Sequence, residues 1–80
     1  MHYVYILKSK ADESTYTGLT KDLKARLQSH NWHTVKTTKS KAPYTIVWYC
    51  AFVSEKPALA FEKYLKTGSG IAFARRHLLH

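Results

Sequence analysis

The sequence lacks the features that mark secreted and membrane proteins. It contains a single cysteine, Cys50, so no disulfide can form within the chain, and nothing else suggests an oxidising compartment. No apolar run approaches the ~20 residues of a membrane-spanning helix, and no signal-peptide pattern opens the chain. We therefore expect a cytoplasmic protein that has no membrane partner.

Acidic residues are also scarce. Thirteen Lys and Arg residues stand against five Asp and Glu residues, which gives a formal net charge of +8 and a pI near 9.8. The basic residues are spread along the whole chain, so a folded basic face is favoured over a disordered basic tail. Such an excess favours a polyanionic partner, because phosphates bound by Lys and Arg release their counterions. Charge alone leaves open the simpler explanation that it keeps a small domain soluble.

The length of 80 residues predicts one compact domain over residues 1–80, with room for a small sheet and two or three helices. Alternating apolar and aromatic residues predict a strand over His2–Lys8, followed by a hairpin loop over Ser9–Ser14. A short returning strand is expected over Thr15–Thr17. Gly18 is expected to end that strand, where the chain needs either a positive φ or a close backbone approach.

A helix is expected over Lys21–His30, with Thr20 as its N-cap and a buried stripe of Leu23 and Leu27. Residues 31–43 are polar and rich in Thr, Ser and Lys, so we interpret them as a mobile basic loop suited to phosphate contact. Residues 44–53 carry no charge. This pattern predicts a central strand that is buried on both faces.

The last third of the sequence predicts two helices. Ser54 is the expected N-cap of the first, which has Pro57 in its first turn and is stopped by residues 68–70. Residues 71–79 are expected to form the second. The side chains expected to pack inward from these helices are Leu59, Phe61, Leu65, Ala72, Ala74 and Leu78.

Five polar residues stand at restrictive spacing: Tyr5 and Tyr16 are eleven positions apart, Arg26 follows ten later, His30 four later, and Glu62 stands in a basic second half. A hard carboxylate oxygen suits Mg²⁺ or Mn²⁺, and a guanidinium suits a phosphate or its transition state. An imidazole can relay protons near neutral pH. A phenol becomes a plausible base only beside a metal or a cation. The set as a whole therefore indicates metal-dependent cleavage of phosphodiesters.

Each of these residues also has an ordinary structural explanation. Glu62 can pair with Lys66 one helical turn later, and Asp22 can pair with Arg26 in the same way. His30 can interact with the negative end of its helix, and tyrosines on strands usually pack in a core. The sequence leaves both explanations open for every single residue.

The sequence resembles the GIY-YIG nuclease superfamily, in particular its small stand-alone bacterial members. Tyr3-Val4-Tyr5 is similar to the first signature triplet and Tyr16-Thr17-Gly18 to the second. Arg26, His30 and Glu62 match the remaining signature positions in order, with matching intervals, so the likeness covers essentially the whole chain.

The resemblance implies a three-stranded antiparallel sheet flanked by three helices, and DNA cleavage with one divalent ion. By resemblance, Glu62 would hold Mg²⁺ or Mn²⁺, and Arg26 would stabilise the scissile phosphate. Tyr5 and Tyr16 would position or deprotonate the attacking water, and which of them is the base stays open. His30 would assist proton transfer.

The chain departs from the family pattern at three places. The first triplet begins with Tyr3 in place of glycine. Leu19 follows the second triplet where some relatives carry lysine, so Lys21 is the candidate substitute. Some relatives place an asparagine near the site after the glutamate, and His77 is the nearest candidate for that position here.

We expect a DNA endonuclease with little sequence specificity, because 80 residues leave no room for a recognition module. A preference for single-stranded or branched DNA would suit a shallow basic groove with exposed aromatics such as Trp32, and a monomer is the default state. The alternatives are a nucleic-acid-binding module without turnover and a nuclease subunit that needs a partner. The candidate DNA contacts are Lys21, Lys24, Trp32, Lys36, Lys39, Lys41, Lys66, Arg75 and Arg76.

Overall fold

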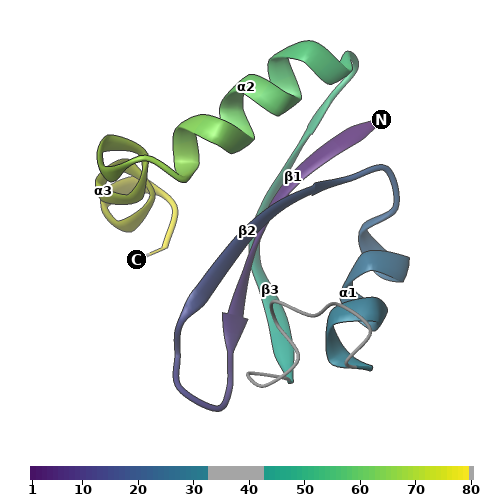
Figure 1. Ribbon diagram of the computed structural model, residues 1–80, viewed down its shortest axis with the longest axis vertical. Coiled ribbons are helices and arrows are strands. Elements are labelled where there is room, and N and C mark those ends of the chain that lie inside the picture. The colour runs from purple at the N-terminus through teal and green to yellow at the C-terminus, as the bar shows by residue number, and fades with distance from the viewer. Residues whose placement is uncertain (33–42, 80) are drawn as a thin grey trace.

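The structure is a computed structural model that describes residues 1–32 and 43–79, so most of the predicted basic loop lies outside the described residues. Its elements in order are β1 (His2–Ser9), β2 (Thr15–Thr20), α1 (Leu23–Asn31), β3 (Tyr44–Phe52), α2 (Glu55–Leu65) and α3 (Gly68–His77). This is the predicted α+β fold, a three-stranded antiparallel sheet with three helices (Figure 1). None of the helices within the described ranges is long and apolar enough to cross a membrane.

β1 is the central strand of the sheet, which has the order β2-β1-β3. Four consecutive residues of β1, Val4 to Leu7, are buried, because the strand has a hydrogen-bonded neighbour on each side and helices over each face. The prediction that residues 44–53 form the central strand was wrong. β3 lies at the edge of the sheet, and its burial alternates, with Tyr44 buried and Tyr49 55% exposed.

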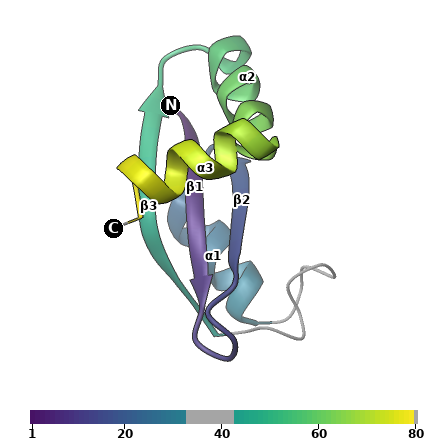
Figure 2. The same ribbon diagram turned by 90° about the vertical axis from the view of Figure 1, so that its left-hand side faces the viewer.

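The helices cover opposite faces of the sheet. In Figure 2, α3 crosses in front of the strands and α1 lies behind them. Val4 and Ile6 pack toward α2 and α3, against Leu65 and Ala74. Alternation along the strand sends the neighbouring side chains to the other face, where the buried residues are Tyr5, Leu7 and Tyr44. Tyr5 is thereby directed toward α1.

α1 begins two residues later than predicted, and its N-cap is Asp22 instead of Thr20. The Asp22 carboxylate accepts a hydrogen bond from the Ala25 N–H at 3.0 Å. The Thr20 hydroxyl accepts from the Asp22 N–H at 3.1 Å and so forms the turn that leads into the helix. A carboxylate at the N-cap also interacts favourably with the positive end of the helix. The cap fixes where the helix starts, and hence where its later residues point.

The turn between α2 and α3 differs from the prediction. Residues 68–70 begin α3 instead of merely stopping α2, because the Thr67 hydroxyl caps the new helix by accepting from the Gly70 N–H. Gly70 is required here, since a side-chain carbon would collide with the Tyr64 carbonyl. Ser54 occupies the N-cap position of α2 but makes no side-chain cap bond. Leu59 and Ala72, both expected to pack inward, are exposed.

Candidate functional site

Tyr5 is the centre of a buried polar cluster on the α1 side of the sheet. Its hydroxyl lies 3.0 Å from Nε2 of His30 and accepts a long hydrogen bond of 3.4 Å from Nε of Arg26. Tyr5 is 1% exposed and His30 is fully buried. The rings of Tyr16 and His30 lie 5.0 Å apart. Four of the five predicted catalytic residues therefore meet in one place.

Two local features bring these residues together. Arg26 and His30 lie one helical turn apart on α1, so both side chains reach the same patch of the sheet. Gly18 pairs with Tyr5 across the β1–β2 ladder, and the Tyr5 ring lies over the glycine. The hydroxyl can therefore extend toward the edge of the sheet formed by β2.

Gly18 was predicted to end its strand, but β2 continues through it to Thr20. None of the described glycines has a positive φ, so backbone freedom is not what this position requires. A side-chain carbon on Gly18 would fall on the Tyr5 hydroxyl and within 2.5 Å of Cζ. The group that approaches Gly18 closely is therefore the Tyr5 side chain, not another stretch of backbone. The absence of a side chain on Gly18 leaves room for the phenol.

The substitution Gly18→Ala should therefore displace the Tyr5 ring from its partners. We expect a loss of roughly 1–3 kcal/mol in the free energy of unfolding, as for overpacked cores, measured by urea denaturation. Gly68→Ala is the matched control, because nothing lies within 4 Å of the added carbon. Equal stability of the two variants would contradict the close packing of Tyr5 on Gly18.

His30 is held in its neutral form at physiological pH. Burial lowers its pKa to about 4, and repulsion by the Arg26 guanidinium acts in the same direction. The neutral imidazole has one donor and one acceptor nitrogen. When its proton is on Nδ1, Nε2 accepts the Tyr5 hydroxyl proton, while the phenol oxygen accepts from Arg26. Burial also raises the pKa of Tyr5, and the bond and charge of Arg26 oppose that rise.

The His30 pKa predicts how stability depends on pH. Between about pH 6.5 and pH 4 the unfolded chain binds a proton at His30 and the folded protein does not. Stability should therefore be lost as the pH falls through this range, by on the order of 3 kcal/mol from this group. Urea denaturation at several pH values would show this slope, and His30→Gln should flatten it. A His30 pKa near 6.5 in an NMR titration would contradict the burial argument.

Glu62 is the fifth predicted residue, and it approaches from α2. It is 8% exposed, and its carboxylate forms an ion pair with Nζ of Lys66, as the structural explanation from the sequence anticipated. Nζ of Lys66 lies 5.9 Å from the centre of the Tyr16 ring, and the charge of Glu62 contributes to the raised pKa of Tyr5. Glu62 thus borders the Tyr5 cluster.

The residues present fit a divalent ion with one protein ligand. Within the described ranges, no group of three or more His, Cys, Asp or Glu residues could hold a metal. Mg²⁺ commonly keeps several waters and takes one or two carboxylates together with substrate phosphates. The buried carboxylate of Glu62 already has a cation beside it, the Lys66 ammonium, which shows that a positive charge is accommodated there.

The alternative pairing of Arg26 with Asp22 does not form, because the Asp22 side chain caps α1 instead. Hydrogen bonding to Tyr5 raises the pKa of Arg26, and Tyr16 contributes in the same direction against the effect of burial. The guanidinium is half-buried and interacts with both phenols. It remains charged and is aimed at the centre of the cluster.

Tyr44 is a member of the cluster that the sequence did not indicate. Its ring lies 5.9 Å from that of His30, and it is 4% exposed. Asn31 holds it there, because the Asn31 amide donates to the Tyr44 carbonyl at 3.2 Å and accepts from the Tyr44 N–H. The position of Tyr44 at the start of an apolar strand was the only available signal. It helps to exclude water from His30.

The predicted DNA contacts are distributed over several elements. Lys21 and Lys24 are exposed at the start of α1, and Trp32 is 69% exposed at its end. Arg75 and Arg76 lie exposed in the last turn of α3. Lys36, Lys39 and Lys41 lie outside the described residues.

His77 does not join the Tyr5 cluster. It is exposed in the last turn of α3, with its ring 5.0 Å from that of Phe73. α3 covers the face of the sheet opposite to Tyr5 (Figure 2). The idea that His77 replaces the family's asparagine therefore gains no support from the geometry.

Comparisons with known proteins show the family to which the chain belongs. A UPF0213 protein of Clostridium perfringens is 42% identical over 67 residues, which are 82% of this chain and 71% of the relative. A UPF0213 protein of Staphylococcus haemolyticus is 42% identical over 69 residues, 85% of this chain and 83% of the relative. The solution structure of a UPF0213 protein from Bacillus halodurans is similar at a TM-score of 0.58 and 33% identity, and the match covers 94% of this chain and 82% of that one. The family model described as the GIY-YIG catalytic domain matches residues 1–71, and this chain belongs to that family.

Proposed function

We propose that the protein is a divalent-metal-dependent endonuclease that hydrolyses DNA phosphodiester bonds with little sequence specificity. One observation carries the proposal: the Tyr5 hydroxyl bridges a neutral His30 and a charged Arg26, beside the buried carboxylate of Glu62. Membership of the GIY-YIG catalytic-domain family supports the same reaction class. The cytoplasm is the expected place of action.

The metal site of the proposal is Glu62, which would hold Mg²⁺ or Mn²⁺. The ion would offset the charge that develops on the phosphate oxygens and make an attacking water more acidic. The Lys66 ammonium is already paired with the Glu62 carboxylate in the structure, so Lys66 and the ion would compete for that carboxylate.

Tyr5 and His30 together provide a route for the proton of the attacking water. The phenol oxygen can take a proton from water while its own proton passes to Nε2 of His30, which lies 3.0 Å away. The water oxygen then forms the new bond to phosphorus as the bond to the leaving oxygen breaks, and the leaving oxygen takes up a proton from a solvent water. This arrangement favours Tyr5 over Tyr16 as the base, because the Tyr5 hydroxyl lies within hydrogen-bond distance of Nε2 of His30.

Arg26 would bind the scissile phosphate. Its Nε is committed to Tyr5, and the fork of the guanidinium retains further donors for a phosphate oxygen. Tyr16 lies within reach of the same guanidinium and beside Lys66, where it can orient the water or the phosphate. Fixed donors aimed at developing charge are usually the largest contribution to such reactions.

Low sequence specificity is expected because the candidate contacts are chiefly lysines and arginines. These side chains bind phosphates, which position DNA without carrying sequence information. Affinity should fall steeply with salt as counterions are released. Cleavage at one defined sequence would contradict this part of the proposal.

The test is incubation of the purified chain with labelled single-stranded, branched and duplex DNA in Mg²⁺, Mn²⁺ or EDTA. The proposal predicts cleavage with either ion and none in EDTA. Binding without cleavage under every condition would support a nucleic-acid-binding module instead. Cleavage that appears only after cell extract is added would indicate a subunit that needs a partner.

A further inference from the structure

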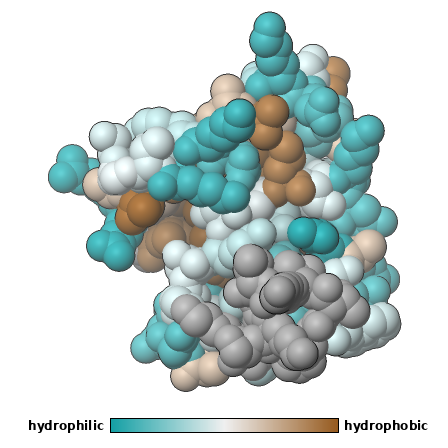
Figure 3. Space-filling view, in the orientation of Figure 1, coloured by the Kyte–Doolittle hydropathy of each residue, from teal (hydrophilic) through white to brown (hydrophobic). Residues whose placement is uncertain are grey.

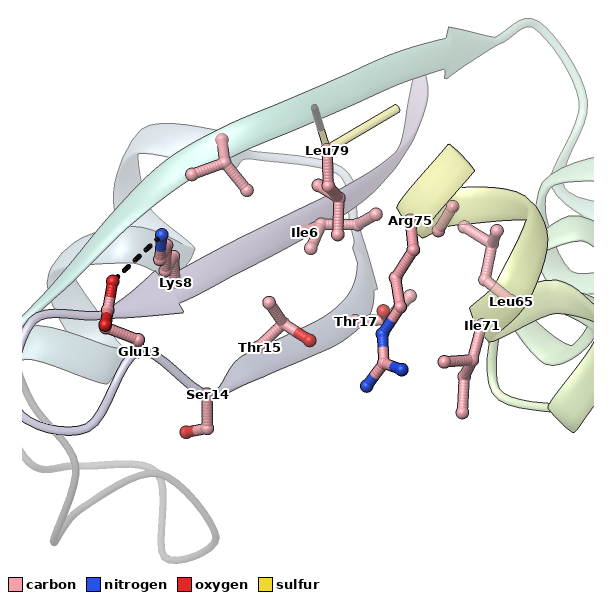
Figure 4. Close-up of a pocket in the computed structure, with 12 residues that line it drawn as sticks. Ile6, Lys8, Glu13, Ser14, Thr15, Thr17, Leu65, Ile71, Arg75 and Leu79 are labelled. Carbon is pink, nitrogen blue, oxygen red and sulfur yellow. Dashed lines mark ion pairs between the residues drawn. The ribbon is translucent and has the colours of Figure 1, made fainter. Parts of the chain in front are cut away.

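A groove lies on the face of the sheet opposite to Tyr5. It has a volume of about 490 Å³ and lies between α3 and the hairpin end of the sheet (Figure 4). Its floor is apolar and includes Ile6, Leu65 and Ala74, and one wall carries the hydroxyls of Thr15 and Thr17. Hydrophobic surface is visible below α3, with hydrophilic residues around it (Figure 3).

Two basic residues line this groove, Lys8 and, from α3, Arg75. The Arg75 side chain leaves α3 and lies between Thr17 and Ile71, with the guanidinium over the opening (Figure 4). No carboxylate among the described residues pairs with Arg75. The single acidic residue lining the groove, Glu13, is paired with Lys8 at 3.4 Å. An unpaired guanidinium beside an apolar floor suits a ligand that has both a phosphate and a flat apolar surface.

The groove and the Tyr5 cluster lie on opposite faces of the same β-strand, β2. Tyr16 faces the cluster, whereas Thr15 and Thr17 on either side of it face the groove. On α2, Leu65 lines the groove, and the next residue, Lys66, pairs with Glu62. β2 is an edge strand, so a flexible chain can pass around it from one face to the other.

We propose that this groove, which we call the Arg75 groove, binds a single-stranded flank of the DNA that is cleaved at the Tyr5 cluster. Arg75 contacts a phosphate of the flank, the hydroxyls of Thr15 and Thr17 hydrogen-bond it, and the apolar floor receives a base. Duplex DNA cannot follow this path, because its persistence length of about 150 base pairs prevents it from bending around the β2 edge of the sheet. The inference rests on the proposed nuclease function and adds a substrate class, DNA with a single-stranded extension.

The test compares Arg75→Gln with Arg76→Gln. The second variant removes the same charge from the adjacent position of α3, which does not line the groove, so it measures the effect of charge alone. Binding is measured by fluorescence anisotropy in EDTA, with a labelled twelve-nucleotide thymidine strand and a blunt duplex as probes. We expect Arg75→Gln to weaken single-strand binding about tenfold, as for a lost guanidinium contact. We expect Arg76→Gln to weaken it by a factor of about two, and the two variants to bind duplex equally.

A second variant tests the groove without changing charge. Thr15→Phe fills the opening and suits a strand, and it should weaken single-strand binding as much as Arg75→Gln does. In NMR spectra, the strand should shift the amide signals of Thr15, Thr17 and Ala74. Equal losses for the two arginine variants, unchanged binding by Thr15→Phe, or shifts confined to the α1 face would each overturn the Arg75 groove.

The two proposals fail separately in these experiments. If wild-type protein cleaves DNA but Arg75→Gln binds it as Arg76→Gln does, the nuclease stands and the groove falls. If the arginine variants differ in EDTA but wild-type protein never cleaves with Mg²⁺, the groove stands as a binding site and the nuclease falls.

Discussion

Replacing Glu62 by glutamine is expected to reduce metal-dependent cleavage by on the order of 10³-fold or more, because a bound ion supplies several kcal/mol of transition-state stabilisation. Glutamine retains the size of the side chain and one carbonyl oxygen. It cannot neutralise a divalent ion, however, and it leaves Lys66 without its ion pair. The measurement is single-turnover cleavage of labelled single-stranded DNA at saturating Mg²⁺.

Glu55→Gln is the matched control, since Glu55 lies on the same helix and is exposed. It should cleave as the wild type does. Lys66→Met gives a second comparison, because removing the competing ammonium should let Mn²⁺ bind more tightly to the same carboxylate. A Glu62→Gln variant that cleaves within a few fold of wild type would remove Glu62 from the mechanism.

Tyr5→Phe carries the second large effect. The phenylalanine keeps the ring on Gly18 but removes the hydroxyl that contacts both His30 and Arg26. We expect cleavage to fall by roughly 10²- to 10⁴-fold, the usual contribution of general acid–base catalysis. DNA binding in EDTA should change little, since the lysines and arginines remain.

Two other tyrosines test this assignment. Tyr49→Phe removes a hydroxyl from an exposed ring on the neighbouring strand and should leave cleavage unchanged. Tyr16→Phe should have a smaller effect than Tyr5→Phe, because the proposed proton route runs through the Tyr5 hydroxyl, 3.0 Å from Nε2 of His30. The reverse order of effects would assign the base to Tyr16, in which case the proton route through His30 is wrong.

The sequence predicted which residues meet in the Tyr5 cluster better than it predicted the order of strands in the sheet. The meeting of Arg26 and His30 could be foreseen because residues four apart on a helix share a face. Their meeting with Tyr5 depends on α1 crossing the sheet, which the family resemblance implied and spacing alone did not. The sequence indicated that another group approaches Gly18 closely. That group was expected to be backbone, but it is the Tyr5 side chain.

The central strand was misassigned for a physical reason. Residues 44–53 are more continuously apolar than β1, but several of their aromatic side chains remain partly exposed, as Tyr49 shows. Composition does not show which strand has neighbours on both sides. The same limit applies to Glu62: the sequence showed a carboxylate four residues before a lysine, but not that the pair lies over Tyr16 with the carboxylate buried.

The most direct test of the central claim is where a divalent ion binds. In an NMR titration, paramagnetic Mn²⁺ broadens amide signals near its binding site even when binding is weak, as expected for an ion with one protein ligand. The account predicts broadening around Glu62 and Tyr16 that disappears in Glu62→Gln. Broadening centred elsewhere, or unchanged by this substitution, would contradict it.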